Sequence, residues 1–370
     1  MGSGALASSS GLVGCGGTTH PASSNPRPVT GYRLGLIGRH RDSVTFRAAA
    51  AAARQRAAEL SASLEIPVEV SVLAPERDDP VAQVEWIEQL VREEAAGIAI
   101  EVAESESLRQ AVADASALGV PVLSFHSDLP ESSRFVFVGI DEVLAGQTLM
   151  RRCVSLLTAH KPDATEYRIA ILGGARQSSL LQRRIEAAQL ESVRHTQVQL
   201  AGTFFHTGTP GDALQTLIAA QRDEGPFDGW VLLGDWPLDD APAGQPPGNK
   251  QVAGPQTAGT AVEGDGAAPV GGGLGQRFPW QPGEVVCVAM DALPAQLARL
   301  KSGEVQMLLA RSYSQVGRRV VELLLDRIGQ GMQPAGEYDF LPCEEVLAPQ
   351  AEELEKKWQT WLSPTTDPPE

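Results

Sequence analysis

Short apolar runs alternate with longer amphipathic stretches along most of this chain. The first runs lie at residues 33–38, 67–73 and 97–102, and a stretch with apolar residues at helical spacing follows each of them. The clearest such stretch, 79–94, carries its apolar side chains on one side. Strands that alternate with helices of this length predict a parallel sheet covered on both faces, with right-handed crossovers.

Residues 119–142 contain two apolar runs that are short enough to be buried parallel strands. The first run ends in the polar residues 126–128, and the second ends in Asp141 and Glu142. In an open α/β sheet, ligands bind just beyond the carboxyl ends of the strands. These polar residues therefore stand where a binding site is expected.

The alternation resumes after Glu142 and continues to about residue 346, which predicts a second series of strands and helices. It is broken at 238–283, where Gly, Pro, Ala and Gln dominate. This segment cannot bury enough apolar surface to order itself alone, so we interpret it as a surface insertion. Residues 350–362 have the pattern of an amphipathic helix in a C-terminal tail, 351–370, whose Pro-rich end is expected to fray.

Length and composition fit a soluble protein with two lobes. The chain has 370 residues, of which 42% are hydrophobic and 21% charged. The formal net charge of −16 argues against a nucleic-acid partner, because phosphate backbones require a basic face. No run approaches the roughly 18 apolar residues of a membrane span.

The N-terminus suggests a tether. Residues 12–15, Leu-Val-Gly-Cys, resemble a bacterial lipobox, in which Cys15 would be lipidated. Residues 1–30 are then a leader with a lipoprotein signal, followed by a Ser/Pro/Gly-rich linker. Residues 1–10 contain no Lys or Arg, which an export signal requires, so a coincidental cysteine in a flexible leader is the alternative. The other cysteines show no zinc-binding spacing and are expected to be buried thiols.

Several segments together resemble a type 1 periplasmic binding protein of the ribose/galactose-binding class. In that family, a strand leads into a T-F-D-S-D-like turn and a second strand ends in G-T-D-N, as in residues 119–142. Residues 311–317 resemble the Q-x-P-x-x-x-G step at which the family's chain returns to its first lobe. The resemblance covers residues 33 to about 346, apart from the insertion.

The resemblance implies an α/β fold of two Rossmann-like lobes, with parallel sheets flanked by helices and a ligand cleft between the lobes. The N-terminal lobe would comprise residues 31–140 and 312–338, and the C-terminal lobe residues 141–311 and 339–350. The chain would cross between the lobes near Asp141, near Arg311 and near Tyr338.

In the N-terminal lobe, the resemblance places ligand contacts in two loops. Asp42 and Phe46 fall where the family has a polar partner and an aromatic ring that stacks on a sugar. The alternatives are a helix N-cap for Asp42 and core packing for Phe46. His126 and Asp128 occupy the acidic places of the turn after the fourth strand.

In the C-terminal lobe, Arg183 takes the place of an arginine that reaches several ligand oxygens, and its planar fork of donors suits that role. The alternative is a solvated arginine beside Arg184. Asp235 is a candidate hydrogen-bonding residue, Trp236 a candidate stacking platform or a cap on the core, and Asp291 a candidate acceptor for ligand hydroxyls. Arg311 stands where the family has a glutamine.

Three departures from the family pattern bear on the ligand. His126 replaces an acid, Arg311 replaces a glutamine and Glu142 replaces an asparagine. With Arg183, the first two favour a ligand rich in acceptors, such as a carboxylate or phosphate. The alternatives are a relaxed site for a neutral polyol and a site that binds nothing.

The resemblance implies an extracytoplasmic solute-binding protein of the periplasm or cell envelope, which captures a sugar-like molecule and delivers it to an ABC permease. A sensory protein that docks on a membrane receptor is the alternative. An effector-binding domain of a transcription regulator would need a basic helix-turn-helix headpiece, which residues 1–30 do not supply. No G-x-S-x-G elbow, H-E-x-x-H pair or phosphate-binding loop is present, so we expect no enzyme activity, no cofactor and no metal.

The lipobox leads to a test of anchoring. Expression in a bacterium is expected to give a membrane-associated protein that Cys15→Ser releases into the soluble fraction, because the lipidated cysteine would be the only anchor. Fractionation and immunoblotting measure the distribution. A wild-type protein as soluble as the variant would rule out the lipobox.

Overall fold

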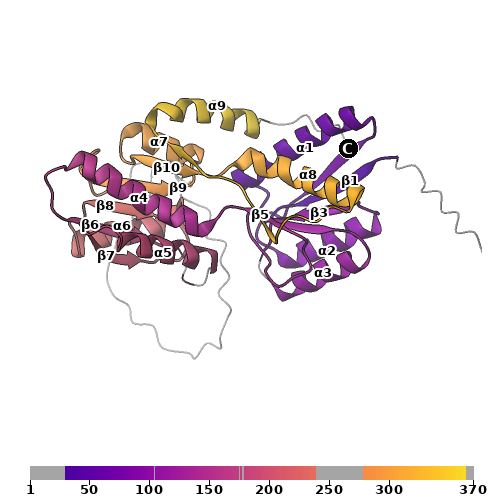
Figure 1. Cartoon of the computed structure of the whole chain (residues 1–370), viewed down its shortest axis with the longest axis horizontal. Coiled ribbons are helices and arrows are strands. Elements are labelled where there is room, and N and C mark those ends of the chain that lie inside the picture. Colours follow the sequence, from indigo (N-terminus) through magenta and orange to yellow (C-terminus); the bar gives the residue numbers. More distant parts are fainter. Residues whose placement is uncertain (1–29, 104, 175, 177–178, 239–277, 364–370) are drawn as a thin grey trace, which may run out of the picture.

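The computed structural model describes residues 30–103, 105–174, 176, 179–238 and 278–363. Within these residues, the strands form two six-stranded sheets, each in its own lobe (Figure 1). The two-lobed α/β fold predicted from the sequence is therefore confirmed. Cys15 and its leader, residues 239–277 of the predicted insertion and the last residues of the tail lie outside the described residues.

The sheet of the N-terminal lobe has the order β11-β5-β4-β3-β1-β2, and all of its strands are parallel. The strands are β1 (Tyr32–Ile37), β2 (Val68–Leu73), β3 (Gly97–Ile100), β4 (Val122–Phe125), β5 (Phe137–Gly139) and β11 (Tyr338–Phe340). Separate apolar clusters cover the two faces of the sheet. Helices α1 (Val44–Leu64) and α8 (Tyr313–Gln330) pack on one face, and α2 (Pro80–Arg92) and α3 (Glu106–Ala117) on the other.

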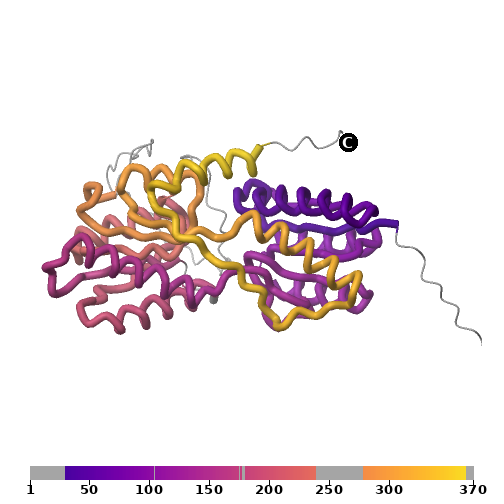
Figure 2. Tube along the Cα trace, turned by 45° about the horizontal axis from the view of Figure 1, so that its top comes forward, coloured from indigo at the N-terminus to yellow at the C-terminus, as the bar shows by residue number. Residues whose placement is uncertain are grey.

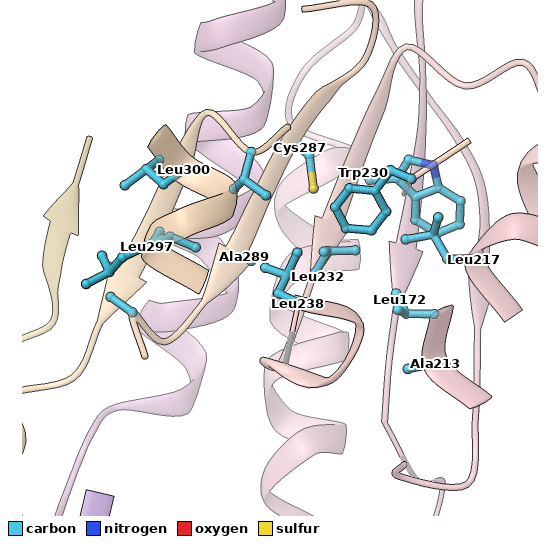
Figure 3. Close-up of a cluster of buried hydrophobic side chains, with 14 of the residues drawn as sticks. Leu172, Ala213, Leu217, Trp230, Leu232, Leu238, Cys287, Ala289, Leu297 and Leu300 are labelled. Carbon is cyan, nitrogen blue, oxygen red and sulfur yellow. The ribbon is translucent and has the colours of Figure 1, made fainter. Parts of the chain in front are cut away.

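The sheet of the C-terminal lobe repeats this plan with the order β12-β10-β9-β8-β6-β7. The strands are β6 (Tyr167–Leu172), β7 (Val198–Phe204), β8 (Gly229–Leu232), β9 (Val286–Met290), β10 (Met307–Ala310) and the antiparallel β12 (Glu344–Val346). Helices α4 (Glu142–His160) and α5 (Ser179–Ser192) cover one face, and α6 (Pro210–Asp223) and α7 (Pro294–Ser302) cover the other. Figure 3 shows the second face, where Trp230 of β8 lies beside Leu217 of α6, and Leu297 of α7 lies at the other side of the same apolar cluster.

Three short segments carry the chain between the lobes (Figures 1 and 2). They are residues 140–141 between β5 and α4, residues 311–312 between β10 and α8, and residues 341–343 between β11 and β12. The last passage lies slightly beyond the predicted Tyr338, because β11 still pairs with β5 in the N-terminal sheet.

The predicted tail contains helix α9 (Ala351–Leu362), which is part of the folded body. Trp358 is 1% exposed, packs on the Tyr313 ring at 4.8 Å and donates its indole N–H to the Ala292 carbonyl at 2.8 Å. One turn further along α9, the Leu362 carbonyl accepts a hydrogen bond from Arg47 of α1 at 2.9 Å. The helix therefore rests on the C-terminal lobe and touches the N-terminal lobe, as its yellow path in Figure 2 shows.

The first helix after each of the first two passages packs on a neighbour through a glycine. A Cβ atom at Gly317 of α8 would lie 1.9 Å from the Ala49 carbonyl oxygen of α1, and one at Gly146 of α4 would lie 2.2 Å from the Arg184 carbonyl oxygen of α5. Neither partner atom belongs to a side chain that could move aside. Both helix pairs therefore depend on the missing Cβ. None of the described helices is long and apolar enough to cross a membrane.

The glycine contact in the N-terminal lobe leads to a stability prediction. We expect Gly317→Ala to lower the free energy of unfolding by about 1–3 kcal/mol, because α8 must move away from α1 to admit the methyl group. Urea denaturation followed by circular dichroism measures the change. Gly211→Ala in α6 is the matched control, since its Cβ would meet nothing within 4 Å. The control should be neutral or stabilising by up to about 1 kcal/mol, because Ala favours helix. Equal losses in both variants would contradict the close-contact argument.

Candidate functional site

The carboxyl ends of the strands of both sheets face the junction of the lobes. The chain leaves β5 and β10 at their carboxyl ends and passes directly into the other lobe, so these sheet edges lie beside the passages. The polar residues that follow the strands are thereby brought to one region. Two of them, His126 after β4 and Asp291 after β9, have left-handed backbone angles, with φ of 56° and 70°. Such conformations are uncommon outside glycine and occur often at functional sites.

Glu142 and Arg184 form a buried ion pair at the start of the C-terminal lobe. The Arg184 side chain is 3% exposed and donates from Nε to Glu142 Oε2 at 2.7 Å. Its Nη1 donates to the Leu233 carbonyl at the end of β8. The predicted ligand residue Arg183 is exposed instead. Only Arg184 enters the buried pair, because successive helical residues point about 100° apart.

Asp291 and Arg311, both predicted as ligand residues, form a second pair. Arg311 Nη2 donates to Asp291 Oδ2 at 3.1 Å, and its Nε lies 2.9 Å from Oδ1. The Tyr313 hydroxyl donates to Asp291 Oδ1 at 3.0 Å and accepts from the Ala292 N–H at 2.9 Å. Burial works to lower the pKa of Arg311, but Asp291 and Glu142 outweigh it, so the pKa lies above its ordinary value. Arg311 therefore stays charged.

These two pairs belong to one group, which we name the paired-charge cluster: Glu142, Arg184, Asp291 and Arg311. All four charges act on the thiol of Cys343 in the third passage, and burial raises the pKa of that thiol to about 11. Cys343 is therefore uncharged at neutral pH. Two guanidinium groups face two carboxylates, so the formal charges of the cluster cancel.

The other two predicted residues of the C-terminal lobe lie on the loop after β8. Asp235 is half-buried, and its charge also acts on Arg311. Trp236 is half-buried, packs against the apolar cluster of the lobe and contacts the His206 ring edge-on at 4.7 Å. Trp236 thus combines a capping contact on the core with partial exposure.

His206 is a residue that the sequence pattern did not single out. Burial lowers the pKa of His206, so its ring is neutral at pH 7. Nδ1 accepts a hydrogen bond from the Gly208 N–H at 3.0 Å, so the proton resides on Nε2. Nε2 is buried and has no hydrogen-bond partner among the described residues. It is a buried donor that no described side chain or carbonyl satisfies.

In the N-terminal lobe, His126 lies beside a carboxylate. Its side chain is 5% exposed, and Nδ1 is 3.6 Å from Glu101 Oε1. Burial would raise the pKa of Glu101, but His126 and the backbone N–H of Arg39 hold it below its usual value. Neither ring nitrogen of His126 has a hydrogen-bond partner among the described residues. His126 and Glu101 therefore form a largely buried polar pair at the carboxyl ends of β4 and β3.

The remaining predicted residues of this lobe have other roles. Phe46 is 2% exposed, stacks on Phe125 at 6.5 Å and fills the space above Gly38, so the core-packing alternative is correct. Asp128 is buried and accepts hydrogen bonds from Ser124 Oγ at 2.9 Å and from Arg134 Nη2 at 2.8 Å. Its carboxylate therefore stabilises the turn after β4. Asp42 is exposed, and the helix N-cap is Ser43, whose side chain accepts from the Phe46 N–H.

The sequence contained signals for some of the missed residues. Glu142 directly follows a strand and an aspartate, a position that marked Asp291 and Arg311 as candidates. Glu101 directly follows β3 in the same way. Which of Arg183 and Arg184 points into the protein depends on how helix α5 is rotated about its axis, and the sequence alone does not show this. Among the described residues, no three His, Cys, Asp or Glu side chains are grouped so as to hold a metal ion.

Comparisons with known proteins agree with this architecture. The family model described as "Periplasmic binding protein domain" matches residues 35–331, so the chain belongs to that family. This confirms the resemblance to type 1 periplasmic binding proteins. A comparison with curated proteins found no match.

Solved structures show the same fold at low sequence identity. An ABC transporter solute-binding protein from Burkholderia graminis, in complex with D-arabinose, is 20% identical, with 86% of this chain and 96% of that chain covered and a TM-score of 0.65. A periplasmic ribose ABC transporter protein from Conexibacter woesei is 15% identical, with 88% and 95% covered and a TM-score of 0.67. A chain of the XylFII-LytSN complex is 16% identical, with 86% and 98% covered and a TM-score of 0.59.

The buried ion pair leads to a stability prediction. We expect Arg184→Ala to lower the free energy of unfolding by about 3–5 kcal/mol, because Glu142 would keep its charge without a partner. Arg183→Ala on the exposed side of the same helix should change it by less than about 0.5 kcal/mol. Chemical denaturation of the two variants measures both values. A larger loss of unfolding free energy in Arg183→Ala than in Arg184→Ala would contradict the assignment of the buried arginine to residue 184.

Proposed function

We propose that this periplasmic binding protein is an extracytoplasmic solute-binding protein, which captures a small neutral polyhydroxylated molecule between its lobes and delivers it to an ABC transporter. A sugar or a sugar derivative is the ligand class. The observation that carries the proposal is the paired-charge cluster, which offers many donors and acceptors at the junction of the lobes without a net charge.

The cluster suits hydroxyl groups because each hydroxyl both donates and accepts a hydrogen bond. The carboxylates of Glu142 and Asp291 can accept from a ligand, and the guanidinium groups can donate to it. Holding these ions in pairs avoids the cost of an isolated buried charge when no ligand is bound. The site is therefore stable when empty and can still make charge-assisted hydrogen bonds to a ligand.

An anionic ligand receives less support from the structure. The sequence suggested one because His126 and two arginines replace or accompany neutral family residues. Arg184 and Arg311 each face a carboxylate, and Glu101 lies beside His126. A carboxylate or phosphate ligand would meet these acids as well as the cations. The charge balance therefore favours a neutral ligand.

The apolar face of a sugar needs a second kind of contact. Carbohydrates pack their C–H faces on aromatic rings while their hydroxyls form hydrogen bonds. Trp236 is the half-buried aromatic ring on the loop that also carries Asp235, and the Nε2–H of His206 lies near it. We assign Trp236 as the platform in place of Phe46.

The arrangement of the passages supports capture by lobe closure. Three short segments connect the lobes, and short connections of this kind act as hinges that let two lobes close around a ligand. His126 lies in one lobe and the paired-charge cluster in the other. Closure would therefore bring polar groups to the ligand from both sides.

Docking on a membrane receptor is the second candidate function. It is favoured by the similarity to a chain of the XylFII-LytSN complex. A permease and an ATPase encoded beside this gene would decide for transport, and a sensor kinase there would decide for sensing. Lipid anchoring through Cys15 remains a prediction in either case.

The proposed ligand class leads to a binding prediction. Calorimetry with D-arabinose, D-ribose, other neutral sugars, polyols and the corresponding sugar acids should identify a neutral ligand. We expect its affinity to fall by roughly tenfold or more in Asp291→Asn, because this change removes a charge that accepts ligand hydroxyls and costs about 2–4 kcal/mol. Trp236→Leu should weaken the same ligand by about 0.5–1.5 kcal/mol.

Arg183→Ala is the control and should bind the ligand as the wild type does. Thermal unfolding without ligand separates loss of binding from loss of fold. Selective binding of the sugar acids would contradict the charge-balance argument. Unchanged affinity in both Asp291→Asn and Trp236→Leu would show that the ligand binds elsewhere on the protein.

A further inference from the structure

A cavity of about 520 Å³ lies between helix α1 and the end of helix α9. Its other walls are the carboxyl end of β2 and Trp86 of α2. None of the four described residues of the paired-charge cluster lines it. We propose that this α1–α9 cavity binds a small aromatic anion, a function beyond the capture of a solute between the lobes.

The hollow follows from the sequence of α1. Residues 48–53 are consecutive alanines, and Ala50 and Ala51 line the cavity. A side chain of one carbon leaves open space between the larger walls formed by Trp86 and Trp361. The volume falls within the roughly 300–1,000 Å³ of small-molecule sites in proteins.

The cavity carries a local excess of positive charge on a chain whose formal net charge is −16. Arg41 and Arg47 line it, and Asp42 is the one carboxylate among its lining residues; Arg54 also lines it but has an interaction of its own. Arg41 lies 3.9 Å from Glu76, but both side chains are largely exposed, at 63% and 83%, so solvent screens this pair.

Arg47 keeps its charge within the cavity wall. It donates to the Leu362 carbonyl at 2.9 Å, and a neutral carbonyl does not compensate the charge of a guanidinium group. Guanidinium groups recognise carboxylate, sulfonate and phosphate groups through parallel hydrogen bonds. The charged part of the ligand is therefore an anion.

The two tryptophans define the rest of the ligand. Trp86 and Trp361 are both half-buried, so part of each indole remains available. Trp361 is held by an edge-on contact with Trp358, at 5.1 Å and 81° between the rings. Flat aromatic molecules pack on such surfaces in offset or edge-on arrangements. An aromatic body with one acidic group matches both features of the cavity.

A ligand in this position would contact both lobes. The arginines, the alanines and Trp86 that line the cavity belong to the N-terminal lobe. Trp361 belongs to α9, which is attached to the C-terminal lobe by the hydrogen bond from Trp358 to Ala292. The cavity thus lies between α1 and the end of α9, whose backbones Figure 2 shows close together.

The test uses a matched pair of fluorescent probes on the full chain. Anilinonaphthalene sulfonate is an aromatic anion, and phenylnaphthylamine has the same ring system without the sulfonate. We expect one molecule of the anion to bind per chain, roughly tenfold more tightly than the neutral probe, because only the anion pairs with the arginines. Energy transfer from tryptophan to the bound anion should fall in Trp361→Leu.

Two substitutions of opposite effect separate binding from damage to the fold. Arg47→Gln should weaken the anion by roughly fivefold, whereas Asp42→Asn should tighten it by about threefold, because it removes a carboxylate from the wall. Because anilinonaphthalene sulfonate also binds partly unfolded chains, the circular dichroism and thermal unfolding of each variant must match those of the wild type. Arg318→Gln, on α8 and outside the cavity, is the matched control. Equal affinity for the two probes, more than one equivalent site, or an equal effect of Arg318→Gln would overturn the proposal.

Discussion

The close contact between α4 and α5 at Gly146 fixes the charged site. The Arg184 carbonyl of α5 lies against Gly146, and the Arg184 side chain pairs with Glu142, one helical turn before that glycine. Helix packing and ion pairing are therefore parts of one contact. A side chain at residue 146 would push the helices apart, and the carboxylate would then lose its partner in a buried position, which is a costly arrangement. The site depends on the missing Cβ.

The N-terminal lobe has a counterpart of this arrangement. Helix α8 is held against α1 at Gly317, and its first residue, Tyr313, donates to Asp291 of the other lobe. In both lobes, a glycine fixes the first helix after a passage, and the residues at the start of that helix reach the site. Packing of the helices thus positions the passages and the polar groups together.

The fold could be predicted because strand and helix periodicities are local, whereas the site required contacts between distant segments. His126, Asp291 and Arg311 directly follow strands, and the structure places them at the junction of the lobes. The sequence did not show that Arg184, beside Arg183, forms the buried pair, because the direction of α5 depends on packing against α4. Phe46 and Asp128 failed for a related reason, since nothing local shows that a ring fills the space above Gly38 or that a carboxylate pairs with Arg134. The departures from the family pattern suggested an anion only while their compensating partners were unknown.

Helix α9 contacts both lobes through residues one helical turn apart, Trp358 and Leu362. Trp358 is buried and hydrogen-bonded in the C-terminal lobe, and losing such a side chain costs about 3–5 kcal/mol. The contact with the N-terminal lobe includes an exposed hydrogen bond from Arg47, of a kind worth only about 0.5–1.5 kcal/mol. Apolar packing also ties α9 to α1, because Ala48 of α1 belongs to the same apolar cluster as Trp358 and Val44 packs against that cluster. A molecule bound in the α1–α9 cavity would contact both lobes and would therefore favour one arrangement of the lobes over another.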